Sequence, residues 1–192
     1  MTSKPDLRKH LAAQRRALHA SDWSARSAKV QASLLADPLF TGARAIALYR
    51  PMGNEVDTAA LHEAALTAGK RVAYPDVVSD GAPMRFVLAG AETPWRLGHL
   101  GFEVPASDQV ILLEDLELFV LPGLGFDRAG RRLGRGAGHY DRTLGLPLRA
   151  PRVGLAFEFQ LIDAVPEDPW DVRLDAVATE LGVIRAPPPL AR

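Results

Sequence analysis

Hydrophobic residues recur along the chain at two spacings, one typical of amphipathic helices and one typical of short buried strands. Leu7, Leu11 and Leu18 fall on one face of the first predicted helix. Asp57 is a suitable cap for the third helix, and Gly69 supplies its C-terminal stop. The first predicted helix covers residues 4–19 and the third covers residues 58–70. The second is expected to begin at an N-cap at Ser21 and to end before Pro38.

Short apolar runs alternate with these helices and predict strands. The expected strands cover residues 45–49, 71–75, 84–89, 118–122 and 153–157, with one or two more within residues 175–184. Residues 94–105, rich in glycine and aromatic side chains, are expected to form a loop. The alternation predicts an α/β fold: a single three-layer α/β/α domain of residues 1–192 with a mostly parallel central sheet. The proline-rich residues 187–192 are expected to be a flexible tail.

Composition and charge narrow the class of protein. The 192 residues are 47% hydrophobic and 24% charged, which is ordinary for a globular domain. Basic and acidic residues both number 23, and a net charge of zero disfavours generic binding to nucleic acid or anionic membranes. The absence of cysteine excludes disulfides and fits a reducing compartment, and no segment resembles a signal peptide or membrane span. We therefore expect a cytoplasmic protein, a monomer or weak dimer, that acts on small molecules and not on nucleic acid or membranes.

The most distinctive segment is the glycine-rich loop of residues 121–142, LPGLGFDRAGRRLGRGAGHYDR. Alternating glycines allow positive φ angles, and the backbone N–H groups of such a run can form a concave anion site. The arginines suit phosphate or carboxylate, and the aspartates could hold a hard cation such as Mg²⁺. These residues are Gly134, Gly136 and Gly138, Arg131, Arg132, Arg135 and Arg142, and Asp127 and Asp141. Composition alone leaves a plain solvated turn open as the alternative.

The strand before the loop favours a binding site over a plain turn. Its apolar run ends at Pro122 and Gly123, which places the loop at the carboxyl end of a strand, where ligands of open α/β sheets bind. The Walker A pattern and the dinucleotide fingerprint GxGxxG are both missing, as are a GxSxG elbow and an HExxH motif. The five histidines show no metal-ligand spacing. The loop is therefore predicted to bind nucleotide phosphates in a pattern outside these common motifs.

The same loop carries a family signature. Pro122-Gly123, Phe126-Asp127, Gly130, Arg132-Leu133-Gly134, Gly136, Gly138 and Tyr140-Asp141-Arg142 resemble the pattern PG-x-x-FD-x-x-G-x-RLG-x-G-x-G-x-YDR of the 5-formyltetrahydrofolate cyclo-ligases. Further landmarks appear in the family's order: Lys4-x-x-x-Arg8, residues 49–58, residues 101–105 and Arg173-x-Asp175. The resemblance covers nearly the whole chain and implies an enzyme of the ligase class.

The resemblance implies an ATP- and Mg²⁺-dependent conversion of 5-formyltetrahydrofolate to 5,10-methenyltetrahydrofolate, with release of ADP and phosphate. It also implies the route. The formyl oxygen attacks the γ-phosphate, N10 adds to the activated carbon, and phosphate leaves as the ring closes. Phosphorylation turns a poor leaving group into a good one, so the protein mainly has to supply positioning and charge neutralisation.

The resemblance further implies the residues of the site, in overlapping groups. ATP is expected to bind Lys4, Arg8, Arg132, Leu133, Gly134, Arg135, Gly136, Ala137, Gly138, His139 and Tyr140. The folate is expected to contact Met52, Glu55, Phe102, Gly136, Gly138, His139 and Tyr140. The Glu55 carboxylate would accept hydrogen bonds from the donors of the pterin ring. Arg135 and Asp141 are expected to be catalytic, and Asp141 and Asp175 to hold Mg²⁺.

One departure from the family and three alternative functions remain. His139 stands where many relatives carry Tyr or Phe, which predicts a pH dependence of ligand affinity. The first alternative is a paralogue acting on another N-formyl or heterocyclic substrate, which the surroundings of Glu55 would distinguish. The second is a non-catalytic folate-binding protein, although a pure binder needs no phosphate-binding cations. The third, a sugar-phosphate isomerase or acyl-transfer enzyme, depends on analogy between folds alone.

Overall fold

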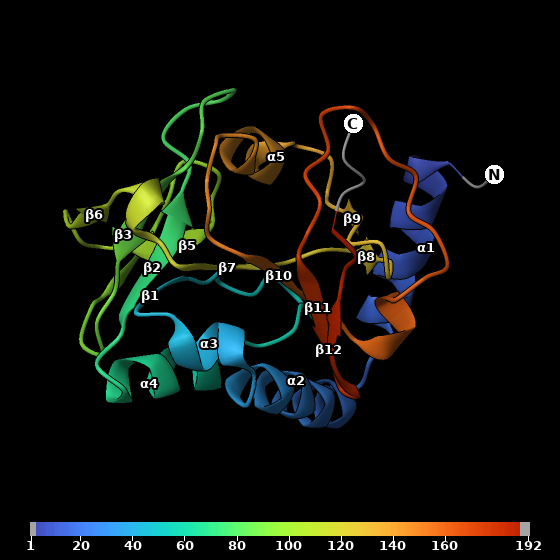
Figure 1. Ribbon diagram of the computed structural model, residues 1–192, viewed down its shortest axis with the longest axis horizontal. Helices are drawn as coiled ribbons and strands as arrows, with labels where there is room; N and C mark the ends of the chain where they lie inside the picture. Colours follow the sequence, from blue (N-terminus) through green and yellow to red (C-terminus); the bar gives the residue numbers. More distant parts are fainter. Residues whose placement is uncertain (1–2, 189–192) are drawn as a thin grey trace.

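An eight-stranded sheet forms the centre of the computed structural model, which describes residues 3–188 (Figure 1). In spatial order the strands are β12 (Gly182–Arg185), β11 (Ala176–Thr179), β10 (Arg152–Leu155), β7 (Leu118–Leu121), β1 (Ala45–Ala47), β2 (Arg71–Asp76), β3 (Arg85–Leu88) and β6 (Val110–Ile111). From β11 to β2 all neighbours are parallel, and β12, β3 and β6 join antiparallel at the two edges. The predicted α/β fold with a mostly parallel sheet is confirmed. Of the expected tail, residues 187–188 carry no regular structure and 189–192 lie outside the described residues.

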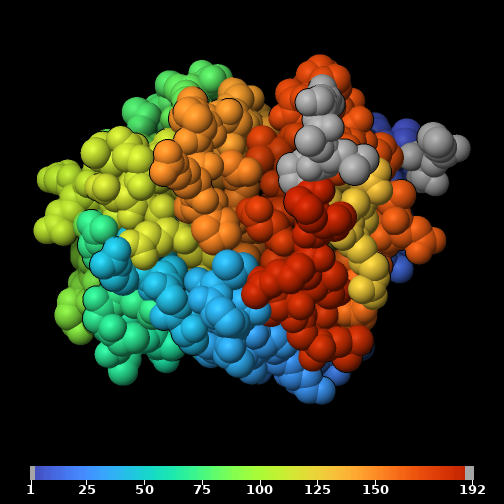
Figure 2. Space-filling model, in the orientation of Figure 1, coloured from blue at the N-terminus to red at the C-terminus, as the bar shows by residue number. Residues whose placement is uncertain are grey.

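Helices cover both faces of this sheet. The helices are α1 (Lys4–Arg16), α2 (Ala20–Leu35), α3 (Pro38–Gly42), α4 (Ala59–Thr67) and α5 (His139–Leu144), with 3-10 turns η1 (Leu113–Asp115) and η2 (Glu158–Gln160). Figure 1 shows α2, α3 and α4 on one side of the sheet and α5 on the other, with α1 beside β8. On the surface, α2 and α3 (blue to cyan) lie below the segment around α5 (orange) in Figure 2. No helix within residues 3–188 combines the length and apolarity needed to cross a membrane.

The two layers of helices create two hydrophobic cores, one on each face of the sheet. Val30 and Leu34 of α2 pack with Leu61 of α4 against one face. On the other face, Leu144 of α5 packs with Phe119 of β7. Because the central parallel strands are buried on both faces, their sequences are continuously apolar, which is why the strand prediction succeeded there.

Other local predictions were only partly correct. The second helix begins at Ala20 with His19 at the N-cap position, so Ser21 lies inside the helix and not at its cap. The helix does end before Pro38, but Pro38 then begins α3, since proline fits the first turn of a helix. The expected loop of residues 94–105 contains a hairpin of β4 (Trp95–Leu97) and β5 (Glu103–Pro105).

The loops that follow the parallel strands meet at one edge of the sheet. The chain leaves β1 toward Tyr49 and Glu55, leaves β2 at Asp76, and leaves β7 at Pro122. After β7, a short hairpin of β8 (Gly125–Phe126) and β9 (Arg132–Leu133) leads into α5. Because α1 packs against β8, the basic residues of α1 are brought to this edge as well.

Candidate functional site

A cavity of about 460 Å³ opens at this edge of the sheet, within the size range of small-molecule sites. It is lined by every residue that the family resemblance implied for the site except Asp175: Lys4, Arg8, Met52, Glu55, Phe102, Arg132, Leu133, Gly134, Arg135, Gly136, Ala137, Gly138, His139, Tyr140 and Asp141. These residues come from α1, the loop after β1, the β4–β5 hairpin and the glycine-rich loop. The fold thus gathers groups that are far apart in the sequence.

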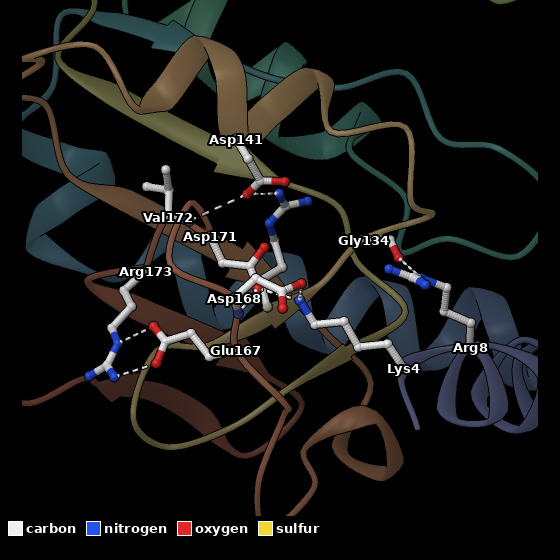
Figure 3. Close-up of polar contacts among 10 residues, drawn as sticks. Lys4, Arg8, Gly134, Asp141, Glu167, Asp168, Asp171, Val172 and Arg173 are labelled. Carbon is white, nitrogen blue, oxygen red and sulfur yellow. Dashed lines mark hydrogen bonds and ion pairs between the residues drawn. The ribbon is translucent and has the colours of Figure 1, made fainter. Parts of the chain in front are cut away.

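The glycine-rich loop adopts a backbone that other residues rarely reach. Gly136 and Gly138 have φ angles of 104° and 69°, whereas Gly134 has an ordinary negative φ. α5 begins directly after Gly138, so a helix starts at the end of the glycine run. Arg8 Nε donates to the Gly134 carbonyl at 3.0 Å (Figure 3), so α1 is tied to the loop at the start of this turn. The positive φ values explain why glycine is required at two of the three alternating positions.

Lys4 lies between two carboxylates of the segment that precedes β11. Its ammonium nitrogen is 2.6 Å from Asp168 Oδ2 and 2.5 Å from Asp171 Oδ2, and the Lys4 side chain is 17% exposed. Figure 3 shows Lys4 reaching from α1 toward both acids, while Arg173 and Glu167 form their own pair to one side. Burial opposes the charged form, but the hydrogen bonds and charges of the two aspartates outweigh it and raise the pKa of Lys4. Lys4 is therefore held protonated at the cavity wall, where its charge is offset by the two aspartates that also line the cavity.

Arg132 is buried and contacts several parts of the glycine-rich loop. Its side chain is only 5% exposed, and Nη2 donates to Asp141 Oδ1 at 3.1 Å. The guanidinium also donates to the Pro122 carbonyl at 3.3 Å and lies 5.3 Å from the centre of the Tyr140 ring. Its Nε is buried without a hydrogen-bond partner among the described residues. Arg132 thus holds the strand end, the ring and the Asp141 carboxylate in one arrangement.

Asp141 is the predicted metal ligand that faces the cavity. Its Oδ1 accepts from Arg132 and, at 3.4 Å, from the Val172 N–H, whereas Oδ2 accepts no hydrogen bond within residues 3–188 (Figure 3). No group of three or more His, Cys, Asp or Glu side chains in that range could hold a metal by itself. Magnesium commonly binds one or two carboxylates together with substrate phosphates, so a single half-buried carboxylate with one free oxygen fits that ion.

The structure does not bring the other candidate carboxylates to this point. Asp175 is exposed at the start of β11, at the amino end of the parallel strands, where its Oδ2 accepts from the Arg152 N–H at 2.7 Å. The proposed pairing of Asp175 with Asp141 around one ion does not agree with this placement, because parallel strands place their amino ends at the opposite edge of the sheet. Asp127 is buried and accepts four hydrogen bonds, from Arg131, Ala129 and Val165, which makes it a structural tie of the β8–β9 turn.

Glu55, the predicted folate acceptor, is a buried carboxylate held by two arginines. Its side chain is 6% exposed, and Oε1 accepts from Arg135 Nη2 at 3.0 Å and lies 3.7 Å from Arg15 Nη1. The second oxygen, Oε2, accepts from the Met52 N–H at 3.0 Å. Arg135, predicted for the phosphates, therefore contacts the group predicted for the folate. The two halves of the predicted site meet at this ion pair.

Apolar and aromatic side chains complete the cavity wall around Glu55. Phe102, at the tip of the β4–β5 hairpin, is 40% exposed, and Met52 is half-buried beside Glu55. Tyr49 is buried and donates its hydroxyl to the Val56 carbonyl at 2.8 Å. Burial raises the pKa of both Tyr49 and Tyr140, so both remain neutral phenols at physiological pH. Flat apolar surfaces beside a carboxylate suit a flat heterocycle with hydrogen-bond donors on its edge.

His139 is the histidine of the glycine-rich loop and the first residue of α5. Burial and the nearby charge of Arg142 lower the pKa of His139 from its usual value. Arg142 Nη2 lies 3.1 Å from His139 Nδ1, and because a guanidinium can only donate, Nδ1 must accept in this contact. His139 is therefore a neutral imidazole at neutral pH.

Sequence reasoning missed three residues that support the site. Arg15 could have been found, since it follows Lys4 and Arg8 at helical spacing on the same face of α1. Asp168 and Asp171 carried no such signal, because they lie in an irregular segment whose contact with α1 is visible only after folding.

Comparisons with known proteins identify the family of the chain. A profile of the 5-formyltetrahydrofolate cyclo-ligase family matches residues 1–180. The 5-formyltetrahydrofolate cyclo-ligase of Escherichia coli K12 is 30% identical over 86% of this chain and 94% of its own length, and the mouse protein of that name is 29% identical over 93% and 94%. The solved 5,10-methenyltetrahydrofolate synthetase of Aquifex aeolicus has a TM-score of 0.86 at 30% identity over 98% of this chain and 95% of its own. The synthetase of Mycoplasma pneumoniae has a TM-score of 0.76 at 30% identity over 93% and 99%. The chain belongs to the 5-formyltetrahydrofolate cyclo-ligase family, whose members are ligases.

Proposed function

We propose that the protein converts 5-formyltetrahydrofolate to 5,10-methenyltetrahydrofolate with hydrolysis of ATP to ADP and phosphate. Family membership supports the reaction, and the residues that line the cavity support the use of a nucleotide. The observation that carries the proposal is the contact between Arg135 and Glu55, at 3.0 Å within one cavity. It places a cation of the glycine-rich loop next to a buried carboxylate, so a phosphate and a heterocycle can be held within reach of each other.

The phosphate end of the proposed site is the part nearest α1. Lys4, Arg8 and Arg135 supply positive charge, and the loop backbone between Gly134 and Gly138 can approach the phosphates closely because it lacks side chains. Asp141 would hold Mg²⁺ through its free oxygen, and that ion, when bound, neutralises phosphate charge. Arg132 keeps the Asp141 carboxylate aimed at the cavity.

The folate end of the proposed site is built around Glu55. Its carboxylate would accept hydrogen bonds from the pterin ring, and the side chains of Met52 and Phe102 would contact the ring faces or the aminobenzoyl group. With the pterin fixed in this way, the formyl group on N5 would point toward Arg135 and the glycine-rich loop. A reacting group held in such a position gains most of its rate from orientation.

The chemistry proceeds in two steps that these residues can support. The formyl oxygen forms a bond to the γ-phosphorus while the bond from that phosphorus to the bridging oxygen of ADP breaks, and the arginine neutralises the charge on the phosphoryl oxygens. The lone pair of N10 then bonds to the activated carbon, and phosphate leaves with the former formyl oxygen. The proton of N10 is lost to solvent as the cationic ring forms.

A spectroscopic assay tests the proposed function. The protein is mixed with 5-formyltetrahydrofolate, ATP and Mg²⁺, and the near-ultraviolet absorbance of the methenyl product is followed. The wild type should form product only with ATP. Arg135→Ala and Asp141→Asn should lose at least about 100-fold in kcat, the scale of losing one transition-state contact, whereas Glu55→Gln should chiefly raise the KM for folate. Absence of product with the folded wild type would refute the proposal.

We further propose that residues 1–192 form a single cyclo-ligase-like domain that works in the cytoplasm as a monomer or weak dimer. The union of all eight main strands in one sheet supports a single domain. The balanced charge of the chain supports small molecules as its partners, without nucleic acid or membranes.

A further inference from the structure

Glu55 is the point at which the proposed nucleotide and folate sites touch, and its carboxylate is already engaged. Oε1 accepts from Arg135 through Nη2 at 3.0 Å and Nε at 3.3 Å, and Oε2 accepts from the Met52 N–H at 3.0 Å. Arg15 Nη1 lies 3.7 Å from the same Oε1. A folate that needs this carboxylate as an acceptor must therefore compete with protein donors.

The two arginines around Glu55 differ in their freedom to move. The Arg15 side chain is 8% exposed, extends from α1, and donates to the Gly123 carbonyl at 3.2 Å. The Arg135 side chain is 47% exposed and extends from the loop beside Gly136. Within residues 3–188 it hydrogen-bonds to Glu55 alone. Arg15 is thus a fixed neighbour of the carboxylate, and Arg135 is a removable one.

The proposed function gives Arg135 a second partner. A nucleotide phosphate carries more charge than a carboxylate and matches the same fork of N–H donors, so it competes strongly for the guanidinium. Departure of Arg135 exposes Oε1 of Glu55 to the cavity. Arg15 remains, which matters because a buried carboxylate without any counter-ion is strongly destabilising.

We propose that Arg135 exchanges between Glu55 and the nucleotide phosphates, with Arg15 as the permanent counter-ion of Glu55, so that nucleotide binding uncovers the folate acceptor and the two substrates bind with positive coupling. This inference rests on the proposed function. The coupling is reciprocal, so folate must tighten nucleotide binding by the same factor. Since a half-exposed ion pair contributes little, the expected effect is about two- to fivefold.

Binding measurements without turnover test the exchange. Calorimetry measures the Kd of 5-formyltetrahydrofolate for the full chain with Mg²⁺, with and without a saturating ATP analogue that has a non-hydrolysable β,γ-methylene bridge. The analogue should tighten folate binding by about two- to fivefold in the wild type. In Arg135→Ala the factor should fall to about one, while folate binding without nucleotide stays as tight as in the wild type or becomes tighter. Arg128→Ala, which removes an exposed arginine outside the cavity, should keep the coupling.

Arg15 is tested by the sign of the coupling. In Arg15→Met the analogue should weaken folate binding, by about tenfold or more, because it draws away the last cation beside Glu55. Arg15→Lys should restore positive coupling. A purely structural role of Arg15 would instead weaken folate binding equally with and without the analogue. Melting temperatures verify folding, and the Arg135→Ala comparison remains decisive if Arg15→Met does not fold.

The outcomes separate this inference from the function on which it rests. If both ligands bind the wild type but do so independently or antagonistically, the exchange is refuted and the proposed function stands. Coupling that persists in Arg135→Ala also refutes the exchange. If folded wild type binds neither ligand, the proposed function and the exchange are refuted together.

Discussion

At the scale of single residues, the site is built from ion pairs that differ in burial. Arg132 with Asp141 and Arg15 with Glu55 are largely enclosed, whereas the Arg135 side chain is nearly half exposed. Enclosed pairs are costly to break, and exposed ones are easily exchanged. The Asp141 and Glu55 carboxylates are thus held in place, whereas the Arg135 side chain is able to move to a bound ligand. His139 adds a titratable group to the glycine-rich loop. The surroundings of the His139 imidazole determine whether its pKa is raised or lowered.

We expect the affinity for nucleotide to depend on pH through His139. Burial and Arg142 lower the pKa of this imidazole, so it is neutral at neutral pH and gains a proton only below its usual value of 6.5. A proton taken up there adds positive charge beside the phosphates, so nucleotide affinity should rise as the pH falls through that range. The check is the Kd of the ATP analogue between about pH 5 and 7.5. His139→Tyr should show a flatter profile, and superimposable profiles would exclude a role for His139.

At the scale of elements, the β8–β9 hairpin positions the rest of the glycine-rich loop. Its turn is closed by Asp127, and Gly130 in the turn accepts from the Leu174 N–H at 2.8 Å. The hairpin therefore ties the segment before β11, which carries Asp171 and Val172, to the strand that carries Arg132. Displacement of this turn would move several cavity residues together.

Gly130→Ala should be distinctly destabilising. A Cβ at Gly130 would overlap the Leu174 carbonyl oxygen, and the φ of 79° is unfavourable for alanine. Gly81→Ala is the matched control, because Gly81 has a similar φ of 81° but open space around its Cβ position. In denaturant unfolding, the free energy of unfolding of Gly130→Ala should be about 1–3 kcal/mol lower than that of Gly81→Ala. Equal free energies of unfolding for the two variants would show that the close contact does not constrain the turn.

The elements also show what sequence patterns can and cannot predict. Strands such as β7 were predicted because burial on both faces makes them continuously apolar, and the glycine-rich loop was predicted because its spacing is local. The β4–β5 hairpin was missed, since its short strands are half exposed and lie among Gly and Pro. The contact between Glu55 and Arg135 joins residues 80 positions apart, so no local pattern contains it. For the same reason the placement of Asp175 at the far edge of the sheet became visible only in the fold.

At the scale of the whole molecule, parallel strands bring loops from the first and last thirds of the chain to one edge of the sheet. α1 supplies basic residues to the cavity wall, and the loop after β1 supplies the Glu55 carboxylate. The glycine-rich loop lies between them and contacts Glu55 through Arg135. In the reaction that we propose, this shared cavity transfers a phosphoryl group to the formyl oxygen of the bound folate. One oxygen atom therefore passes from the folate to the released phosphate, and this atom can be labelled.

The most direct test follows that atom. 5-Formyltetrahydrofolate labelled with ¹⁸O in the formyl group is converted by the wild type with unlabelled ATP and Mg²⁺, and the released phosphate is analysed by mass spectrometry. If the formyl oxygen attacks the γ-phosphate, each phosphate formed with the methenyl product carries one ¹⁸O atom. Unlabelled phosphate accompanying full formation of the methenyl product would contradict the proposed mechanism.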